Sequence, residues 1–386
     1  MKSFAFSSAE FDPVVAGLIA EELALRSRRS VDIPTLASWT AATALGASGI
    51  GLSADERSAS ARRLARFLGC DPQRFSAQSG TLGEWSQAAA KESGRNLLAF
   101  AFAPAGGDAD GAAVRPAAEV FADAAHIANL LHGRRRLVSV VARHGLLGFS
   151  SAVAAPKLLG IPAIDARGRR PEEFQKLLEF GDAVIAAPAT WRYLVGGGVR
   201  APDNVIAASF GEATTAELAA DMRKAGFGAL RELYGATETG LIGWRDSPAD
   251  PFTLFGHWRR DGDLLARRLA TGAEWRAAPM ENLEWTGERS FLLGARRDGA
   301  VRIGAVNVYP QRIAAVICAH PAVEDCRIAA ARLRGGANCL TARVKLKGSH
   351  PLADNLARDI EHWGRSQLRP QERPRIYNFV EKIGDQ

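Results

Sequence analysis

The sequence is poor in cysteine and has no pattern that would bind zinc or build a disulfide framework. Four cysteines are spread over 386 residues without a Cys-x-x-Cys pair. They are Cys70, Cys318, Cys326 and Cys339. No apolar run reaches the roughly 18 residues of a membrane-spanning helix, and Met1–Phe6 lacks the apolar core of a signal peptide. We therefore expect a cytoplasmic protein with no membrane partner.

A concentrated basic region is also missing, although the net charge is +7. The arginine runs Arg134–Arg136, Arg259–Arg260 and Arg267–Arg268 are short and scattered, without interleaved aromatic residues. This pattern argues against a nucleic-acid partner. The excess positive charge suits polyanionic ligands such as ATP and CoA, and solubility explains it equally well.

Composition is that of a globular protein, with 47% hydrophobic and 24% charged residues, and the length allows two or three domains. Residues 1–95 predict a helical N-terminal subdomain, because apolar residues recur at helical spacing in Val14–Leu23 and Ala61–Leu68. Ser53–Glu56 predicts a capping box for the second of these helices. The region distantly resembles an acyl-carrier bundle, but Gly46–Gly49 lacks the acidic residue that precedes a carrier's modified serine. A subdomain that only packs is the simpler interpretation.

From residue 96 to 294 the sequence alternates between apolar strands and helical patterns. Such alternation predicts an α/β core with a doubly wound, mainly parallel sheet. The expected strands are Leu97–Ala103, Leu137–Val141, Ala183–Ala187, Val205–Ala208 and Ala229–Leu233, and the expected helices include Pro116–Leu131 and Thr215–Ala225. Ligands of such folds sit at the carboxyl ends of the strands.

One motif, Tyr234–Gly240, directly follows the last of these strands and reads Tyr-Gly-Ala-Thr-Glu-Thr-Gly. Gly235 lets the backbone approach a flat purine, Thr237 offers a hydroxyl to phosphate, and Glu238 offers oxygen to Mg²⁺. The motif therefore predicts a nucleotide and magnesium site at this strand end. A plain turn with a chance acidic residue is the alternative.

A second motif, Leu292–Pro310, is followed by His320–Val323. It resembles the hinge and the start of the small C-terminal domain of acyl-CoA ligases. Residues 295–386 are accordingly expected to form a small α+β lid domain, with a helix over Pro310–Ala319, strands near Cys326–Ala330 and Leu340–Lys345, and a helix over Pro351–Gln367.

With both motifs in this order, residues 96–386 resemble the adenylate-forming, acyl-CoA synthetase superfamily. The sequence of Gly304–Pro310 is similar to that of the 4-coumarate–CoA ligase subfamily associated with the photoactive yellow protein chromophore. The resemblance implies that the protein uses ATP to convert an aryl or acyl carboxylate into an acyl-adenylate. A rotation of the small domain then lets the thiol of CoA displace AMP.

The resemblance also implies roles for individual residues. By this resemblance, Thr237, Glu238 and His144 are expected to be catalytic. Glu238 would be the Mg²⁺ ligand, and His144 would lie beside the acyl pocket. The resemblance makes Asp298 the pivot of the small domain. The residues implied to bind the nucleotide are Tyr234, Gly235, Ala236, Gly211, Glu212, Gly106 and Gly107, with Arg296 and Glu281 on the ribose.

Two departures from the family pattern bear on activity. The usual phosphate loop is rich in hydroxyls and ends in Pro-Lys, whereas Phe102–Gly111 has no hydroxyl and carries Asp108 and Asp110. Each carboxylate within about 5 Å of a phosphate would cost roughly 1 kcal/mol or more at an effective dielectric near 20. The C-terminal segment Val380–Gln386 has Lys382 but not the family's Gly-Lys, whose ammonium stabilises the adenylation transition state.

These departures leave three functions open. The first is an ATP-dependent aryl- or acyl-CoA ligase. The second is a non-adenylating binding module for acyl-CoA or acyl-adenylate, and the third is an acyltransferase that starts from preformed acyl-CoA. The distinguishing feature is a basic group at the phosphate site, for which Arg115, Arg143 and Lys382 are candidates. The acceptor is CoA or an acyl-carrier protein, and a homodimer stays open.

Overall fold

The computed structural model of the chain describes residues 5–27, 29–75, 80–96, 98–103, 111–269, 271–297, 299–303, 306–332, 338–348 and 354–383. Gly106, Gly107 and Asp298 lie outside these residues. The chain divides into two compact units. The first holds Met1–Pro279 and Leu283–Leu293, and the second holds Met280–Asn282 and Gly294–Gln386.

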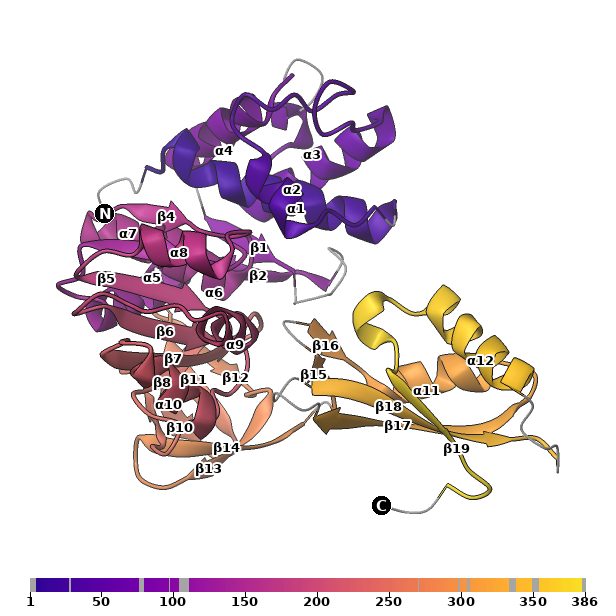
Figure 1. Cartoon of the computed structure of the whole chain (residues 1–386). Helices are drawn as coiled ribbons and strands as arrows, with labels where there is room; N and C mark the ends of the chain where they lie inside the picture. Colours follow the sequence, from indigo (N-terminus) through magenta and orange to yellow (C-terminus); the bar gives the residue numbers. More distant parts are fainter. Residues whose placement is uncertain are drawn as a thin grey trace. The chain divides into compact units, whose positions relative to one another are not determined.

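The first unit begins with helices (Figure 1). They are α1 (Ser8–Arg26), α2 (Ile33–Ser38), α3 (Ala54–Leu68), the short 3-10 helix η1 (Pro72–Phe75) and α4 (Leu82–Asn96). The predicted capping box of α3 is confirmed, because Ser53 Oγ accepts from Glu56 N at 3.2 Å and Ser53 N donates to Glu56 Oε2 at 2.9 Å. Together these bonds satisfy two backbone donors that the helix itself cannot.

A two-stranded antiparallel hairpin, β1 (Ala99–Phe102) and β2 (Ala113–Pro116), follows the helices. The strand expected at Leu97–Ala103 is observed over Ala99–Phe102, with Leu97 outside the described residues, but it lies in this hairpin and not in the parallel sheet. The reason is aromatic packing: the Phe67 ring of α3 lies 5.4 Å from that of Phe100 and 5.3 Å from that of Phe102. Burial of these rings attaches the hairpin to the helical region.

Within the described residues, the largest sheet has nine strands in the order β13-β14-β9-β8-β7-β6-β5-β3-β4. The pairs from β4 to β7 are parallel, and β8, β9 and β14 extend the sheet antiparallel. The strands are β3 (Arg136–Ser139), β4 (Ala163–Asp165), β5 (Asp182–Ala186), β6 (Ile206–Phe210), β7 (Ala229–Ala236), β8 (Gly240–Arg245), β9 (Phe252–Leu254), β13 (Glu281–Trp285) and β14 (Ser290–Arg296). The predicted mainly parallel core is confirmed.

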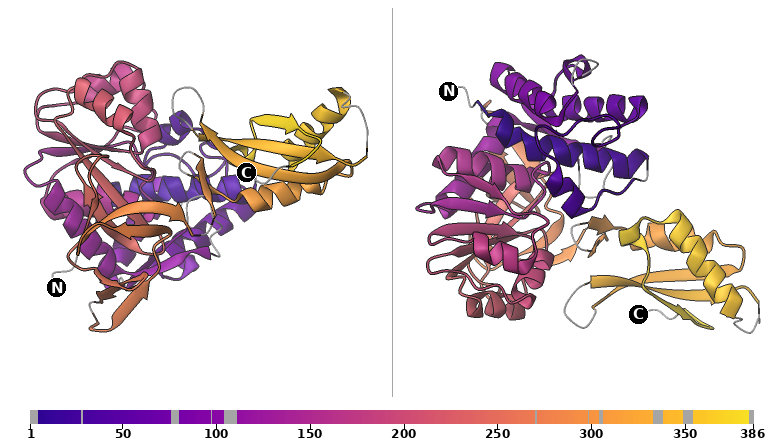
Figure 2. Two further views of the ribbon diagram at one scale, coloured as in Figure 1. Left: turned by 90° about the horizontal axis from the view of Figure 1, so that it is seen from below. Right: turned by 45° about the horizontal axis from the view of Figure 1, so that its top comes forward.

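Helices cover both faces of this sheet (Figures 1 and 2). They are α5 (Ala117–Leu130), α6 (Leu146–Phe149), the π-helical turn η3 (Ser150–Ala154), α7 (Ala155–Leu159), α8 (Pro171–Leu177), α9 (Pro188–Gly196) and α10 (Ala216–Lys224). Ala183 and Ile185 of β5 pack in the same apolar cluster as α5, whereas Val184 packs with α8 and α9. Alternate residues of a strand point to opposite faces, so the apolar run in β5 is explained by burial on both sides.

A small antiparallel sheet completes the first unit. It consists of β10 (Arg259–Asp261), β11 (Leu264–Arg268) and β12 (Glu274–Ala277). Trp258, directly before β10, is 1% exposed and packs with Phe252 and Phe291.

The second unit has its own apolar core. Its elements are β15 (Val301–Ile303), β16 (Val306–Val308), α11 (Pro310–Cys318), β17 (Val323–Arg332), β18 (Asn338–Leu346), α12 (Asp354–Gln367), η4 (Pro370–Glu372) and β19 (Ile376–Phe379). Ile313 and Ile317 of α11 pack with Ile360 of α12 against the sheet β17-β18-β19. The expected strands and the first expected helix are confirmed, and the second expected helix is confirmed from Asp354 onward, since residues 351–353 lie outside the described residues.

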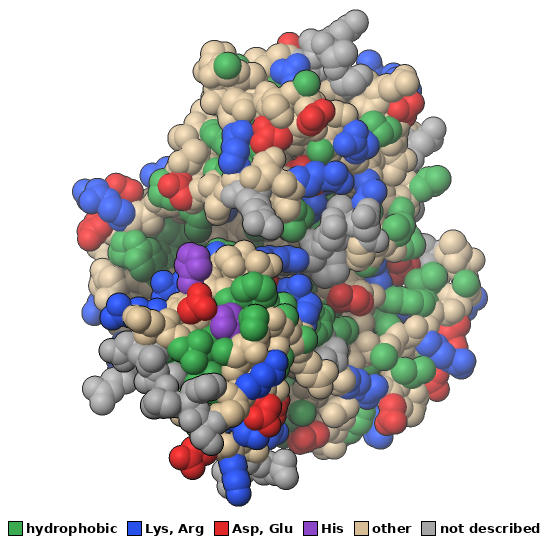
Figure 3. Space-filling model, turned by 90° about the vertical axis from the view of Figure 1, so that its right-hand side faces the viewer, with side chains coloured by type: hydrophobic (Ala, Val, Ile, Leu, Met, Phe, Trp, Pro, Cys, Tyr) green, Lys and Arg blue, Asp and Glu red, His purple; other side chains and the backbone are tan. Residues whose placement is uncertain are grey.

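On the face drawn in Figure 3, basic side chains are interspersed with acidic ones and do not form one continuous stripe. In the part of the chain that the structure describes, no helix combines the length and apolar character needed to cross a membrane.

Candidate functional site

The Tyr234–Gly240 motif forms the end of β7, a three-residue turn and the start of β8. Phe210, the last residue of β6, pairs in parallel register with Leu233. Gly211, with φ of +106°, therefore follows β6 at the same carboxyl edge at which the motif follows β7. The predicted nucleotide residues of β6 and β7 are thus brought together.

Two of the motif residues predicted to bind the nucleotide, Tyr234 and Gly235, are held by packing. Tyr234 is 8% exposed, and its ring centroid lies 5.6 Å from that of Phe252 and 5.8 Å from that of Phe291. A Cβ on Gly235 would lie 2.4 Å from the carbonyl oxygen of Gly240. Glycine is therefore required at position 235 by the close pairing of β7 with β8, in addition to the expected access for a purine.

Arg115 of β2 anchors the turn of the motif. Its Nη1 donates to the carbonyl oxygen of Glu238 and its Nη2 to that of Thr239, both at 3.2 Å. The guanidinium is buried and lies 4.3 Å from the centroid of the Trp275 ring. Thr237 is half-buried and Glu238 is exposed. Arg115 therefore binds backbone carbonyls of the turn, while the side chains of Thr237 and Glu238 remain accessible to a ligand.

A buried charge cluster supports the same turn. Asp123 Oδ2 accepts from Leu241 N at 2.9 Å, and Arg267 Nη1 lies 3.2 Å from Asp123 Oδ1. Arg267 also pairs with Glu119. A Cβ on Gly240, whose φ is +77°, would lie 2.5 Å from Asp123 Oδ2. Burial raises the pKa of Asp123 to about 6, although Arg267 and Arg115 work against that shift.

Two histidines, His126 and His257, also pack beneath the start of β8 that follows the turn. His257 Nε2 lies 3.1 Å from the carbonyl oxygen of Leu241, and its Nδ1 lies 2.7 Å from His126 Nε2. Nε2 must carry the proton to donate to that carbonyl, so Nδ1 accepts from His126. Burial lowers the pKa of His257 to about 3, helped by the nearby charge of Arg267. Both histidines are therefore neutral at pH 7.

These supporting residues are not predicted by the motifs of the sequence, although α5 carries a signal for them. Glu119, Asp123 and His126 stand at positions i, i+4 and i+7 in the otherwise apolar Ala117–Leu130. Residues with that spacing share one helix face, so a polar face directed into the protein could have been anticipated. The partners Arg267 and His257 are more than a hundred residues away in sequence and carry no local signal.

His144 follows β3 at the same carboxyl edge of the sheet. Its Nε2 lies 3.5 Å from Glu21 Oε2 of α1, and its side chain is 17% exposed. A Cβ on Gly17 would lie 2.1 Å from His144 Nδ1, so only glycine at this position of α1 leaves room for the ring. Burial lowers the pKa of His144. The histidine is therefore neutral and covered by the N-terminal helix.

Arg296 and Glu281, the predicted ribose residues, both belong to the second unit. Arg296 Nη1 donates to Glu281 Oε1 at 2.9 Å, because β13 and β14 are neighbours and bring the two ends of the hairpin together. Elsewhere, Glu212 pairs with Arg192 at 3.3 Å. Lys382 is exposed.

The donor set suits Mg²⁺ carried by a nucleotide. Among the described residues there is no cluster of three or more His, Cys, Asp or Glu side chains able to bind a metal alone. Magnesium in nucleotide enzymes is bound by one or two carboxylates and by substrate phosphates. One exposed carboxylate, Glu238, fits that arrangement.

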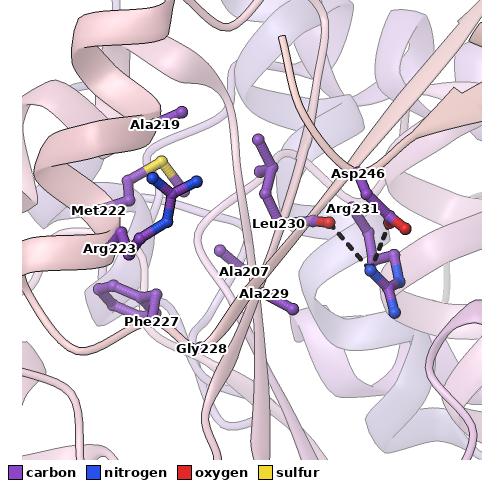
Figure 4. A pocket seen from close by; sticks show the side chains of 10 residues that line it. All are labelled: Ala207, Ala219, Met222, Arg223, Phe227, Gly228, Ala229, Leu230, Arg231 and Asp246. Carbon is purple, nitrogen blue, oxygen red and sulfur yellow. Dashed lines mark hydrogen bonds and ion pairs between the residues drawn. The ribbon is translucent and has the colours of Figure 1, made fainter. Parts of the chain in front are cut away.

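A separate cavity of about 280 Å³ lies at the opposite edge of the sheet. Ala207 is near the start of β6, and Ala229, Leu230 and Arg231 begin β7 (Figure 4). Arg231 is already paired with Asp246. This cavity contains none of the predicted site residues.

The architecture is shared with solved synthetases. It superposes on an o-succinylbenzoate–CoA synthetase from Bacillus subtilis with a TM-score of 0.56 and 15% identity, over 71% of this chain and 64% of that one. It superposes on an amide bond synthetase from Marinactinospora thermotolerans with a TM-score of 0.57 and 13% identity, over 96% and 90%. The chain therefore has the fold of the adenylate-forming synthetases.

Sequence comparison narrows the relationship. The chain is 32% identical over 257 residues to a 4-coumarate–CoA ligase of Halorhodospira halophila, covering 65% of this chain and 64% of the relative. It is 32% identical over 211 residues to that of Rhodobacter capsulatus, covering 54% and 52%. The chain thus spans less than two thirds of the length of these curated relatives. No family model matches. The predicted resemblance to adenylate-forming enzymes of the 4-coumarate–CoA ligase type is confirmed.

Proposed function

We propose that the protein is an ATP-dependent aryl- or acyl-CoA ligase. The observation that carries the proposal is the Tyr234–Gly240 turn. It lies at the carboxyl edge of a parallel sheet beside Gly211, in a chain with 32% identity to 4-coumarate–CoA ligases over 257 residues. In the proposed reaction a carboxylate oxygen attacks the α-phosphorus of ATP and pyrophosphate leaves. The CoA thiolate then attacks the acyl carbon and AMP leaves.

The residues of this chain have distinct tasks in the proposal. Glu238 binds the nucleotide's Mg²⁺, and Thr237 donates its hydroxyl to the α-phosphate. Tyr234 closes one side of the adenine site with its buried ring, since its aromatic neighbours prevent it from turning away. His144, neutral at pH 7, lines the acyl side without bringing charge to it.

The remaining assignments follow the family resemblance. Gly235, Ala236, Gly211 and Glu212 contact adenine, Arg296 and Glu281 bind the ribose, Gly106 and Gly107 approach the phosphates, and Asp298 is the hinge. We propose CoA as the acceptor and a carboxylic acid as the substrate, with an acyl-carrier protein and a homodimer as further options to test.

The test is pyrophosphate release with ATP, Mg²⁺ and a panel of aryl and short acyl carboxylates. Glu238→Ala is the test variant, and Glu172→Ala, which removes an exposed glutamate of α8, is the matched control. We expect acid-dependent release that falls at least about a hundredfold in Glu238→Ala, because electrostatic contacts made in the transition state commonly supply several kcal/mol. The control should retain it. Equal activity in both variants would remove Glu238 from the site.

One observation favours the second candidate, a protein that binds acyl-CoA or acyl-adenylate without forming it. The phosphate loop has no lysine or hydroxyl, and Arg115, a candidate replacement cation, is hydrogen-bonded to the carbonyls of Glu238 and Thr239. Calorimetry separates the two. Absent ATP binding together with micromolar binding of an acyl-CoA would select the second candidate and exclude the ligase.

A further inference from the structure

Arg143 differs from the other buried arginines. Among the described residues, the arginines classed as buried are Arg63, Arg115, Arg143, Arg245 and Arg267. Four of these five donate hydrogen bonds to carboxylates or backbone carbonyls. Arg143 is 4% exposed, and both its Nε and its Nη2 are buried without a hydrogen-bond partner. A buried guanidinium with two unsatisfied nitrogens is disfavoured, and a ligand that accepts hydrogen bonds from them would account for its retention.

The carboxylate of Asp165 acts electrostatically on Arg143, but its oxygens are hydrogen-bonded to Arg167. Asp165, the last residue of β4, accepts from Arg167 Nε at 3.0 Å and from Arg167 Nη2 at 2.7 Å. Burial works against ionisation of Asp165, but these bonds and the charges of Arg167 and Arg143 prevail, and its pKa is lowered. Arg143, Arg167 and Asp165 together carry one net positive charge. Arg143 is therefore the cation whose charge is not balanced by the Arg167–Asp165 ion pair.

The neighbours on the other side do not neutralise Arg143. His144 Nδ1 is buried without a hydrogen-bond partner, and burial keeps the ring neutral. Glu21, which faces His144 Nε2, is paired with Arg63. Arg143 and His144 follow Ser139, the end of β3, at the carboxyl edge where ligands of parallel sheets bind. Arg143 thus belongs to the edge of the sheet that carries the proposed site.

We infer that Arg143 binds a second, non-reacting carboxylate of the acyl substrate, so that the preferred acids are dicarboxylic. This inference rests on the proposed ligase function. A reacting carboxylate loses its charge when it is activated, and an arginine bound to it would favour the ground state over the transition state. A spectator carboxylate keeps its charge throughout, and the planar guanidinium can bind its two oxygens with two parallel hydrogen bonds.

Calorimetry without ATP tests the inference with matched acids, benzoate against terephthalate and cinnamate against 4-carboxycinnamate. We expect each dicarboxylate to bind at least about tenfold more tightly than its partner. In Arg143→Met this preference should disappear while binding of the monocarboxylates is unchanged. Arg143→Lys should restore part of it, and Arg223→Met, which removes an exposed arginine of α10, should leave it intact.

A folding readout distinguishes ligand binding from a structural role. Because Nε and Nη2 of Arg143 make no hydrogen bond, Arg143→Met should leave the Tm unchanged or raise it. A large drop in Tm would show that Arg143 stabilises the fold and would overturn the inference. Equal binding of mono- and dicarboxylates, or loss of ATP affinity in Arg143→Met, would also overturn it, the latter by assigning the cation to phosphate. Discrimination between the acids without any pyrophosphate release would support the inference and reject the ligase function.

Discussion

At the scale of single residues, the site is built on side chains that act through the backbone. Arg115, Asp123 and His257 hold carbonyl and amide groups of residues 238–241, and none of them belongs to the motif itself. The motif presents Thr237 and Glu238, while residues distant in sequence position them. Buried charges of this kind are costly when one partner is removed.

The pH dependence of stability follows from two of these groups. The pKa of His257 is about 3 in the fold against an ordinary 6.5, so its contribution to stability is present above pH 6.5 and is lost as pH falls towards 3. The pKa of Asp123 is raised from 3.8 to about 6, so protonation of this carboxyl has the opposite, stabilising effect as pH falls through 6. The effect of His257 extends over the wider pH range, because its pKa shift is the larger of the two.

We predict that the wild type loses about 1–2 kcal/mol of unfolding free energy relative to His257→Gln between pH 7 and pH 5. The glutamine amide can still donate to the Leu241 carbonyl, but it cannot take up a proton. Urea unfolding at several pH values measures the difference, and exposed His132→Gln is the control. Parallel pH profiles for wild type and His257→Gln would show that His257 is not held neutral.

At the scale of elements, the hairpin β1–β2 connects the N-terminal helices to the motif. Arg115 of β2 reaches the turn between β7 and β8. The hairpin is attached to α3 through Phe67. The N-terminal helices therefore contribute to the position of the motif although they carry none of its residues.

We predict that Arg115→Met lowers the unfolding free energy by about 3–5 kcal/mol, because it leaves Asp123 and two carbonyls with uncompensated polarity. Arg276→Met, which removes an exposed arginine paired with Asp261, should change it by less than about 0.5 kcal/mol. Denaturant unfolding measures both variants. Similar small effects would mean that the charge cluster is open to water.

At the scale of the whole molecule, the two compact units have separate apolar cores. The core of the second unit includes Ile313, Ile360 and Leu340, and that of the large sheet includes Ile185 and Val184. Units with independent cores commonly unfold in separate steps. In the proposed function this independence would serve the rotation of the small domain between adenylation and transfer to CoA.

We predict two transitions in calorimetry. Ile313→Ala, which leaves a cavity at a site with 0% exposure, should destabilise only the transition of the second unit, by about 2–5 kcal/mol. Ile185→Ala, also at 0% exposure, should affect only the other transition. A single transition that both variants shift equally would contradict independent unfolding.

The sequence by itself determined the order of the elements and the place of the motif. Apolar runs such as that of β5, and helical spacing such as that of α5 and α11, depend on local periodicity, which can be read without knowing any partner. The strand leading into Tyr234–Gly240 could be predicted for the same reason. The family resemblance followed from contiguous residues as well, and both comparisons agree with it.

Tertiary structure alone decided which distant residues support the site. It brought Arg115 to the carbonyls of residues 238 and 239, paired Arg267 with Asp123, and buried Nε and Nη2 of Arg143 without hydrogen-bond partners. It also put the strand at Ala99–Phe102 in a hairpin beside α3. Such pairings depend on loop closure across many residues and on burial of charge, and both are properties of the folded chain that no local pattern encodes.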